Sequence, residues 1–164
     1  MEPTKLVVLL AGTGANGYAV EADLVAQGMP MEMADRDVLG PIPTIADDEA
    51  RVAAFTTAMI DTIERHRGPP RQVEPAAAWT VQPQTILPPR EAFFAPNEVV
   101  PAAAAIGRVS AELVAPYPPG VPVLAPGELI TSAAVAALLE VAADGGRIAY
   151  AADPTLATFQ VVVA

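Results

Sequence analysis

Proline constrains this chain more than any other residue type, because most of its 18 prolines fall in two stretches. One stretch runs from Gly68 to Pro89, and the other is the segment PYPPGVPVLAPGE at 116–128. Proline fixes φ and has no N–H to donate, so neither stretch should form a regular helix. We expect an extended connector at 68–89, and at 116–128 an extended path with turns at Pro119-Gly120 and Pro126-Gly127.

Composition indicates a folded, acidic chain without thiol chemistry. Hydrophobic residues make up 52% of the 164 residues, which is enough for one compact domain or two small lobes. The formal charge of −10 repels nucleic acids and anionic membranes, so we expect neither as a partner. The absence of cysteine excludes disulfides, thiolate metal sites and a thiol nucleophile. No export signal is recognisable, and a cytoplasmic location is expected.

The first part of the chain predicts a strand, a glycine-rich turn and a helix. The strand is expected at 5–10 and the helix at 17–27. Short segments at 31–33 and 38–45 are expected to return to the same sheet. The second of them is expected at a sheet edge, because Gly40, Pro41 and Pro43 interrupt it.

A second helix is predicted after Asp47, which we expect to be its N-cap, with Asp48 and Glu49 in the first turn. Its apolar residues recur at helical spacing and form one stripe that ends before Gly68. The members of the stripe are Val52, Phe55, Met59, Ile60 and Ile63.

The last part of the chain predicts two helices and two strands, after a connector that Trp79 is expected to anchor. Asn97 is expected to cap an Ala-rich helix that reaches about Leu113. Thr131 or Ser132 is expected to cap the final helix, with Val135, Leu138, Leu139 and Ala142 facing inward. Closing strands at 147–150 and 158–163 are expected to pair around the Asp153-Pro154 turn.

The glycine turn also matches a nucleotide-binding pattern. Gly12, Gly14 and Gly17 form a G-x-G-x-x-G between the expected strand and helix, and Asp35 follows at the distance at which an acidic residue would meet a ribose. Against this pattern, the next strands are interrupted by proline and no further alternating strand–helix units follow. Dinucleotide binding through this turn is one alternative, and a plain glycine turn, or a glycine loop near another ligand, is the other.

Four stretches resemble the C-terminal portion of the bacterial Orn/Lys/Arg decarboxylase family, whose members are pyridoxal-phosphate enzymes of fold type I. They are PTKLVV at 3–8, GMPMEMAD at 28–35, PREAFF at 89–94, and the run 107–128 with PYPPG and PGE. The resemblance implies an α+β chain: a small-domain segment of a fold-type I enzyme at 1–67, a proline-rich connector at 68–89, and an appended α+β C-terminal domain at 90–164.

Family members hold pyridoxal phosphate through a lysine upstream of everything seen in this chain. The only lysine is Lys5, interpreted as an exposed charge at the end of a strand, and the only histidine is His66, interpreted as a solvated cation at a helix C-terminus. The chain alone is therefore expected to bind no cofactor and to be inactive. The resemblance implies a pyridoxal-phosphate-binding catalytic domain, upstream or on a separate chain, and homo-oligomers of the complete enzyme.

The resemblance assigns substrate recognition to Glu32, whose carboxylate would meet the distal cation of arginine, lysine or ornithine, and more weakly to Asp35. A structural role is expected for the signature residues Tyr117, Pro118, Pro119, Gly120, Pro126, Gly127 and Glu128. The Gly40-Pro41-Ile42-Pro43 run departs from the plain hydrophobic strand that is usual in the family, and the chain is expected to be a fragment or a split gene product. A free-standing binding or regulatory module is the remaining alternative.

Overall fold

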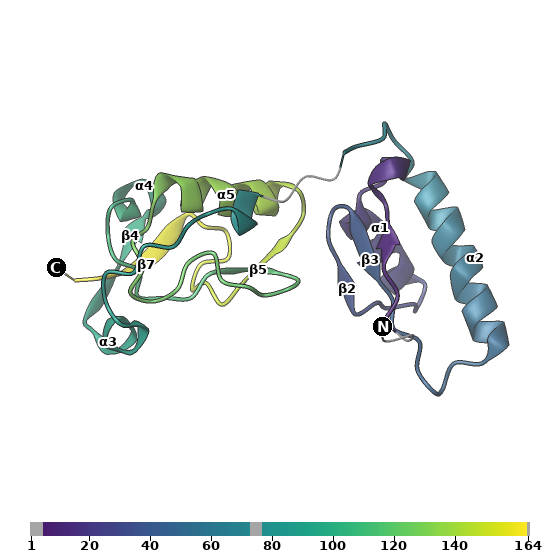
Figure 1. Ribbon diagram of the computed structural model, residues 1–164, viewed down its shortest axis with the longest axis horizontal. Helices are drawn as coiled ribbons and strands as arrows, with labels where there is room; N and C mark the ends of the chain where they lie inside the picture. The colour runs from purple at the N-terminus through teal and green to yellow at the C-terminus, as the bar shows by residue number, and fades with distance from the viewer. Residues whose placement is uncertain (1–4, 73–76, 164) are drawn as a thin grey trace. The chain divides into compact units, whose positions relative to one another are not determined.

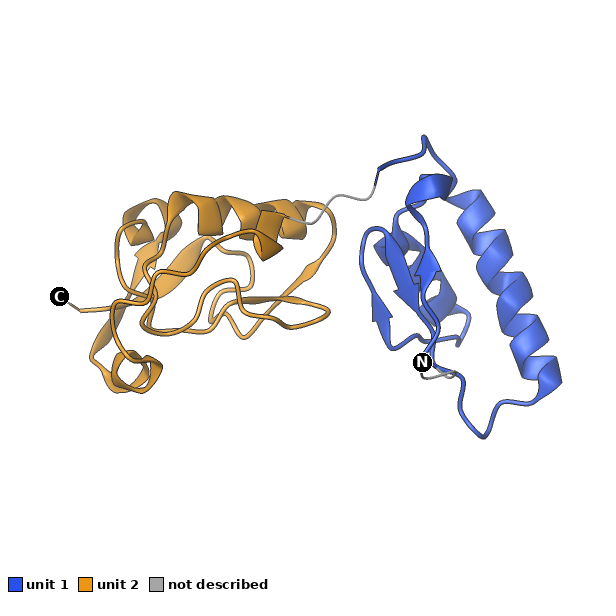
Figure 2. Ribbon diagram, in the orientation of Figure 1, with its two compact units in different colours: residues 1–74 blue, residues 75–164 orange. Residues whose placement is uncertain are grey.

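The chain forms two compact units, residues 1–74 and 75–164, in a computed structural model that describes residues 5–72 and 77–163 (Figures 1 and 2). Pro3 and Thr4 of the PTKLVV segment lie outside the described residues. Both units combine helices and strands, so the expected α+β class is confirmed. In the described part of the chain, no helix is both long and apolar enough to cross a membrane. The boundaries expected at 67 and 89 remain predictions about the family's domains.

Unit 1 contains a small antiparallel sheet with strand order β1-β3-β2. Its strands are β1 (Val8–Leu9), β2 (Met33–Ala34) and β3 (Val38–Gly40). The edge position expected for the third of these strands is wrong, because β3 pairs with β1 on one side and with β2 on the other. This central position is possible because the strand ends at Gly40, one residue before Pro41, whose missing N–H would interrupt the ladder.

Two helices accompany this sheet, α1 (Gly17–Ala26) and α2 (Glu49–Arg65), with a short 3-10 helix η1 (Ala11–Thr13) before them. They lie side by side within unit 1 (Figure 1). The N-cap of α2 is Asp48, whose carboxylate accepts the Arg51 N–H at 2.8 Å. Asp47 instead accepts hydrogen bonds from Thr44 and closes the turn before the helix, so its predicted capping role is wrong by one residue.

The core of unit 1 lies between α1, the sheet and the C-terminal half of α2. Its buried members are Leu10, Ala15, Val20, Leu24, Ala34, Leu39 and Ile63. Of the predicted stripe on α2, Ile63 is buried, Phe55 and Met59 are half-buried, and Val52 and Ile60 are 45% and 52% exposed. The stripe is therefore only partly covered within the unit that carries it.

Unit 2 contains two separate strand pairs. The strand β4 (Asn97–Pro101) pairs with β7 (Thr158–Val162), and β5 (Ala115–Tyr117) pairs with β6 (Arg147–Ala149). The two closing strands exist, but their predicted pairing with each other is wrong. Each instead extends along an earlier strand, and β7 turns Phe159 and Val161 into the core.

Four helices complete the described part of unit 2, residues 77–163: η2 (Ala77–Trp79), α3 (Pro89–Phe94), α4 (Ala102–Ala105) and α5 (Ser132–Ala143). The helix predicted from Asn97 to Leu113 is wrong, because the pairing with β7 holds 97–101 extended and leaves one turn of helix after Pro101. Trp79 is 41% exposed and does not anchor its segment. The neighbouring Ala78 is the residue buried in the core.

The final helix of the prediction is confirmed as α5, with Thr131 as its N-cap through a 3.1 Å bond from the Ala134 N–H. It contacts β5, β6 and η2 within unit 2 (Figure 1). Val135 and Leu138 are buried as expected, but Leu139 is exposed, and the buried face is completed by small residues. The buried cluster around this helix contains Val114, Leu124, Ile130, Ala134, Ala137, Ile148, Leu156 and Phe159.

Candidate functional site

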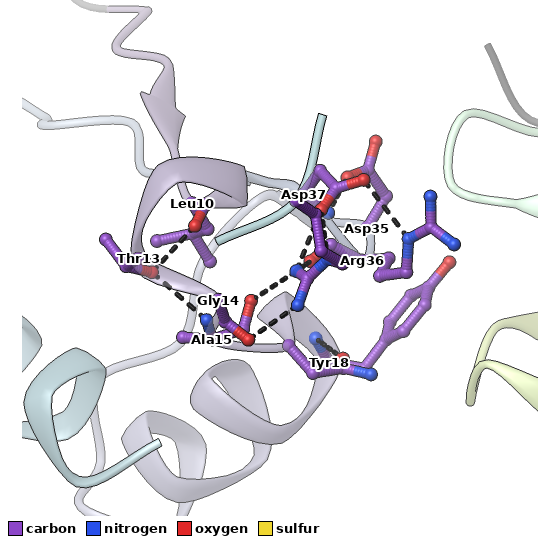
Figure 3. A network of polar contacts seen from close by, with 10 residues as sticks. Leu10, Thr13, Gly14, Ala15, Tyr18, Asp35, Arg36 and Asp37 are labelled. Carbon is purple, nitrogen blue, oxygen red and sulfur yellow. Dashed lines mark hydrogen bonds and ion pairs between the residues drawn. The ribbon is translucent and has the colours of Figure 1, made fainter. Parts of the chain in front are cut away.

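Five backbone amides of the glycine turn in unit 1 donate to groups within the same unit (Figure 3). Thr13 N donates to Leu10 O, Gly14 N to Ala11 O, Ala15 N to Thr13 Oγ1, Gly17 N to Arg36 O, and Tyr18 N to Asn16 Oδ1. A phosphate-binding turn offers such amides to its ligand. These five donate elsewhere, which counts against the dinucleotide alternative.

Packing accounts for two of the glycines in this pattern. A Cβ at Gly17 would overlap the carbonyl oxygen of Asp35, and one at Gly14 would overlap that of Gly68. Gly14 also has φ of +73°, in the left-handed region that favours glycine. Gly14 and Gly17 are thus explained by close approach of the turn to two other segments of unit 1, whereas the space at Gly12 is open.

Arg71 closes this turn by binding its carbonyl groups and a buried carboxylate. Its guanidinium donates to Gly14 O and, at 2.7 Å, to Ala15 O, and its Nη2 lies 2.8 Å from Asp37 Oδ1. The Asp37 side chain is 9% exposed and also accepts from Arg36 Nε at 3.1 Å. No sequence pattern pointed to this role of Arg71, because the residue lies in the proline-rich stretch interpreted as a connector.

The two predicted substrate-binding carboxylates lie at opposite ends of β2 and differ in what they contact. Glu32 is exposed, and its carboxylate forms no hydrogen bond or ion pair with any residue in 5–72 or 77–163. Asp35 is half-buried, and its Oδ1 accepts the Asp37 N–H at 2.8 Å in the turn between β2 and β3. Only Glu32 therefore offers an uncommitted carboxylate.

The chain's lysine and histidine do not form a pyridoxal-phosphate site in the described structure. Lys5 is exposed, and the nearby glycine turn has no spare amide among those named above. His66 is half-buried at the C-cap of α2, and its Nε2 lies 2.9 Å from Asp23 Oδ2. This bond from His66, helped by Arg65, lowers the pKa of the exposed Asp23 carboxyl group. His66 thus lies at the C-terminus of α2 as expected, but it is half-buried and links α2 to α1 instead of being fully solvated.

The PGE signature lies where three segments of unit 2 meet. Gly127 O accepts the N–H groups of Ile86 and Leu87 at 2.8 and 3.0 Å, and Gly127 N donates to Ser110 O at 2.8 Å. Glu128 Oε2 accepts the Ala125 N–H at 2.8 Å across the turn. These contacts support a structural role, in which the turn holds the end of the proline-rich stretch.

The PYPPG signature begins within strand β5, which ends at Tyr117, and it carries that tyrosine at the surface. The Arg147 guanidinium lies 4.7 Å from the centroid of the Tyr117 ring, a cation–π distance. Gly120, with φ of +84°, turns the chain against the same ring. The Tyr117-Pro118 and Pro118-Pro119 peptide bonds are cis. The turns expected at 119–120 and 126–127 are both present, the first of them one residue earlier, at 118–119.

One carboxylate that sequence reasoning missed is Glu112, which is buried in unit 2. Its Oε1 accepts the Gln160 N–H and its Oε2 the Ala152 N–H, both at 2.7 Å. A single acidic residue within the apolar run 111–115 was the available signal. Both carboxylate oxygens accept backbone N–H groups, so Glu112 joins its own segment to those at 152 and 160. The carboxylate is therefore not available for catalysis. No group of His, Asp and Glu suited to a metal ion occurs among the described residues.

Comparisons with known proteins bear on this arrangement. Residues 74–148 match the family model described as "Orn/Lys/Arg decarboxylase, C-terminal domain". The chain is 30% identical over 98% of its length to an arginine decarboxylase of Halalkalibacterium halodurans, of which it covers 33%. Over 33% of its length it is 40% identical to the constitutive lysine decarboxylase of Escherichia coli, covering 8% of that protein.

Solved structures share the fold. The structure of the constitutive lysine decarboxylase of Escherichia coli matches 98% of this chain and 31% of its own, with a TM-score of 0.71 at 18% identity. That of the Francisella novicida lysine decarboxylase matches 99% of this chain and 31% of its own, with a TM-score of 0.72. The chain spans about a third of the length of the curated relatives that it matches first. Through residues 74–148 the chain thus matches the C-terminal domain of the Orn/Lys/Arg decarboxylase family, and nearly its whole length is similar to an arginine decarboxylase, as the resemblance predicted.

Proposed function

We propose that this chain is the C-terminal part of a pyridoxal-phosphate-dependent decarboxylase of basic amino acids, and that it is not catalytic by itself. Unit 1 would correspond to a small-domain segment of a fold-type I enzyme and unit 2 to the appended domain. The observation that carries the proposal is the 30% identity to an arginine decarboxylase along 98% of the chain. The cofactor would be held by a catalytic portion outside this chain.

The residues of this chain support that division of roles. Pyridoxal phosphate supplies an electron sink for the carbon–carbon bond that breaks, and it needs a lysine and a phosphate cradle. Lys5 is exposed, and the amides of the glycine turn at 13–15, 17 and 18 donate to other groups of unit 1. The described residues therefore do not fit the cofactor, and we expect purified chain mixed with pyridoxal phosphate to release no carbon dioxide.

Substrate recognition is the contribution we propose for Glu32. Its carboxylate is exposed and uncommitted, so it can approach the distal ammonium or guanidinium of a basic substrate without first breaking an internal bond. A charge-assisted hydrogen bond of this kind favours a cation over a neutral side chain, and more strongly once water is excluded. Asp35, already bound to the Asp37 N–H, would contribute charge at longer range.

The experiment uses the complete decarboxylase that contains this chain, with arginine, lysine and ornithine as substrates. Glu32→Gln should lower kcat/KM for the preferred substrate by on the order of ten- to a hundredfold, because a truncated charge pair costs about 2 kcal/mol or more. Asp61→Asn, which removes an exposed carboxylate from α2, is the matched control and should change it by less than about twofold. Equal kinetics for wild type and Glu32→Gln would remove the assigned role.

A further inference from the structure

Strand β1 leaves one edge of the unit 1 sheet unpaired among the described residues. Leu6 N donates to Pro41 O, Leu10 N donates to Asp37 O, and Val8 stands opposite Leu39 in the ladder. Because bonding alternates along an antiparallel strand, the N–H and C=O groups of residues 7 and 9 point away from β3. These groups form no hydrogen bond with a residue in 5–72 or 77–163.

The same two residues are apolar and exposed. Val7 and Leu9 have exposed fractions of 66% and 67%, in a run of five residues, 6–10, that is entirely Leu and Val. Natural proteins protect exposed edges with charge, proline or a bulge, because such an edge pairs with any available strand. This edge has none of these devices at 6–10, which indicates that another chain segment pairs with it.

A groove of about 640 Å³ lies against the same strand, between β1 and the N-terminal half of α2. Its apolar lining includes Leu6, Val8, Val52, Phe55 and Met59. These side chains are three members of the apolar stripe on α2, together with Val8 of β1 and Leu6 just before that strand. A segment paired to β1 would therefore have an apolar cavity beside it for its own side chains.

The charged and hydroxyl side chains at the groove, Thr44, Asp47, Arg51 and Thr56, each contact another group of unit 1. Asp47 binds Thr44, the Arg51 N–H donates to Asp48, and Arg51 Nη1 lies 3.5 Å from Ala46 O. A charged small molecule would have to compete for these groups, whereas an apolar polypeptide segment would not. The groove thus favours an extended, apolar stretch of polypeptide.

We propose that the β1 edge and this groove receive an apolar strand from the catalytic portion of the decarboxylase. The matched relatives carry about two thirds of their length outside the region that corresponds to this chain, and that length is the source of the strand. This inference rests on the proposed function and names the surface through which unit 1 joins the catalytic part.

The test is co-expression of the chain with the remaining two thirds of the Halalkalibacterium halodurans arginine decarboxylase, followed by purification of the complex. Val52→Glu, on the groove, should reduce the recovered complex at least tenfold. Ile60→Glu is the matched control, because it lies on the same helix with similar exposure but does not line the groove. Val7→Pro removes an N–H that has no described acceptor, and it should weaken the complex in the same way.

Hydrogen exchange in the complex supplies a readout that does not depend on the variants. The amides of residues 7 and 9 should exchange at least tenfold more slowly in the complex than in the chain alone. Equal losses of recovered complex for Val52→Glu and Ile60→Glu would overturn the inference while leaving the proposed function intact. So would unchanged hydrogen exchange at the amides of residues 7 and 9. Failure of wild-type chain to bind, when the relative's own matched third does bind, would overturn both.

Measurements on the chain without the catalytic portion distinguish two other possible occupants of the groove. Sedimentation that shows a dimer of wild-type chain and a monomer of Val52→Glu would assign the groove to a second copy and overturn the inference. Slow exchange at residues 7 and 9 in a monomeric chain would assign it to another segment of the same chain, with the same consequence. A monomer with fast exchange at both amides supports the inference.

Discussion

Asp37 and Arg71 are joined by an ion pair of 2.8 Å between Oδ1 and Nη2, although 34 positions separate them. The pair holds the segment after α2 against the glycine turn, because the same guanidinium donates to the carbonyl groups of Gly14 and Ala15. Arg71 N also donates to Ala11 O at 2.8 Å. One side chain thus closes unit 1 by joining its last described segment to its first turn.

Replacing Arg71 by alanine should destabilise unit 1 by about 2–3 kcal/mol, because it leaves the buried Asp37 carboxylate without its main cation. For a domain of this size, each kcal/mol lowers the Tm by about 4–8 °C. Hydrogen exchange of amides in α1 and α2 measures the loss, and the fluorescence of Trp79 reports unit 2 as an internal reference. Arg67→Ala removes a solvent-exposed pair with Glu64 and should have little effect on stability. Equal costs would contradict the role of the Asp37 pair.

Asp153 should give unit 2 an acid-sensitive contribution to stability. Hydrogen bonds from the Thr155 and Thr158 hydroxyl and amide groups lower the pKa of Asp153 from 3.8 to about 2. Because the folded pKa lies below the unfolded one, the contribution is complete above about pH 4 and is lost as the pH falls through about 2.

An NMR titration of the carboxyl carbon of Asp153 should therefore show a midpoint near pH 2. Thr155→Val removes the hydroxyl with the largest effect and should move the midpoint upward toward the ordinary value for aspartate. A wild-type midpoint close to 4 would contradict the hydrogen-bonded geometry of this turn.

The sequence predicted best where one local signal decided the structure. The helix α2 carries a full apolar stripe and an acidic first turn, and α5 has a threonine cap, so both were located within one or two residues. Segment 97–113 failed for the opposite reason. Its alanines favour a helix, but Asn97–Pro101 forms strand β4 because β7, about 60 residues later, pairs along its whole length.

The polar contacts between distant residues could not be predicted from the sequence. The pairs Arg71–Asp37 and His66–Asp23 join residues more than 30 positions apart, and no spacing rule connects such partners. The carboxylate at Glu32 could be singled out only through its resemblance to a family motif. The structure shows that this carboxylate is exposed, but under the proposed function the surface that would face it lies in a catalytic portion outside this chain.

Gly127 should tolerate alanine far less well than Gly107 does. Both have positive φ, +90° and +85°, so alanine is strained at either position by about 1–2 kcal/mol. Only at Gly127 would the new Cβ also overlap the Leu87 carbonyl oxygen, whereas the space at Gly107 is open. Urea unfolding followed by Trp79 fluorescence should show a loss at least about 2 kcal/mol larger for Gly127→Ala. Similar losses for the two variants would refute the steric role of the PGE turn.

Glu112→Gln should destabilise unit 2 even though the substitution preserves shape. The carboxylate accepts one backbone N–H at each oxygen, from Gln160 and Ala152. An amide side chain must turn its NH₂ group toward one of these donors, which leaves a buried donor unpaired at a cost of about 1–3 kcal/mol. The matched control is Glu98→Gln, an exposed partner of Arg108, which should cost less than about 1 kcal/mol. The same urea titration compares the two variants. An unchanged free energy of unfolding for Glu112→Gln would mean that the two backbone bonds of Glu112 contribute little to holding residues 152 and 160 against the segment before β5.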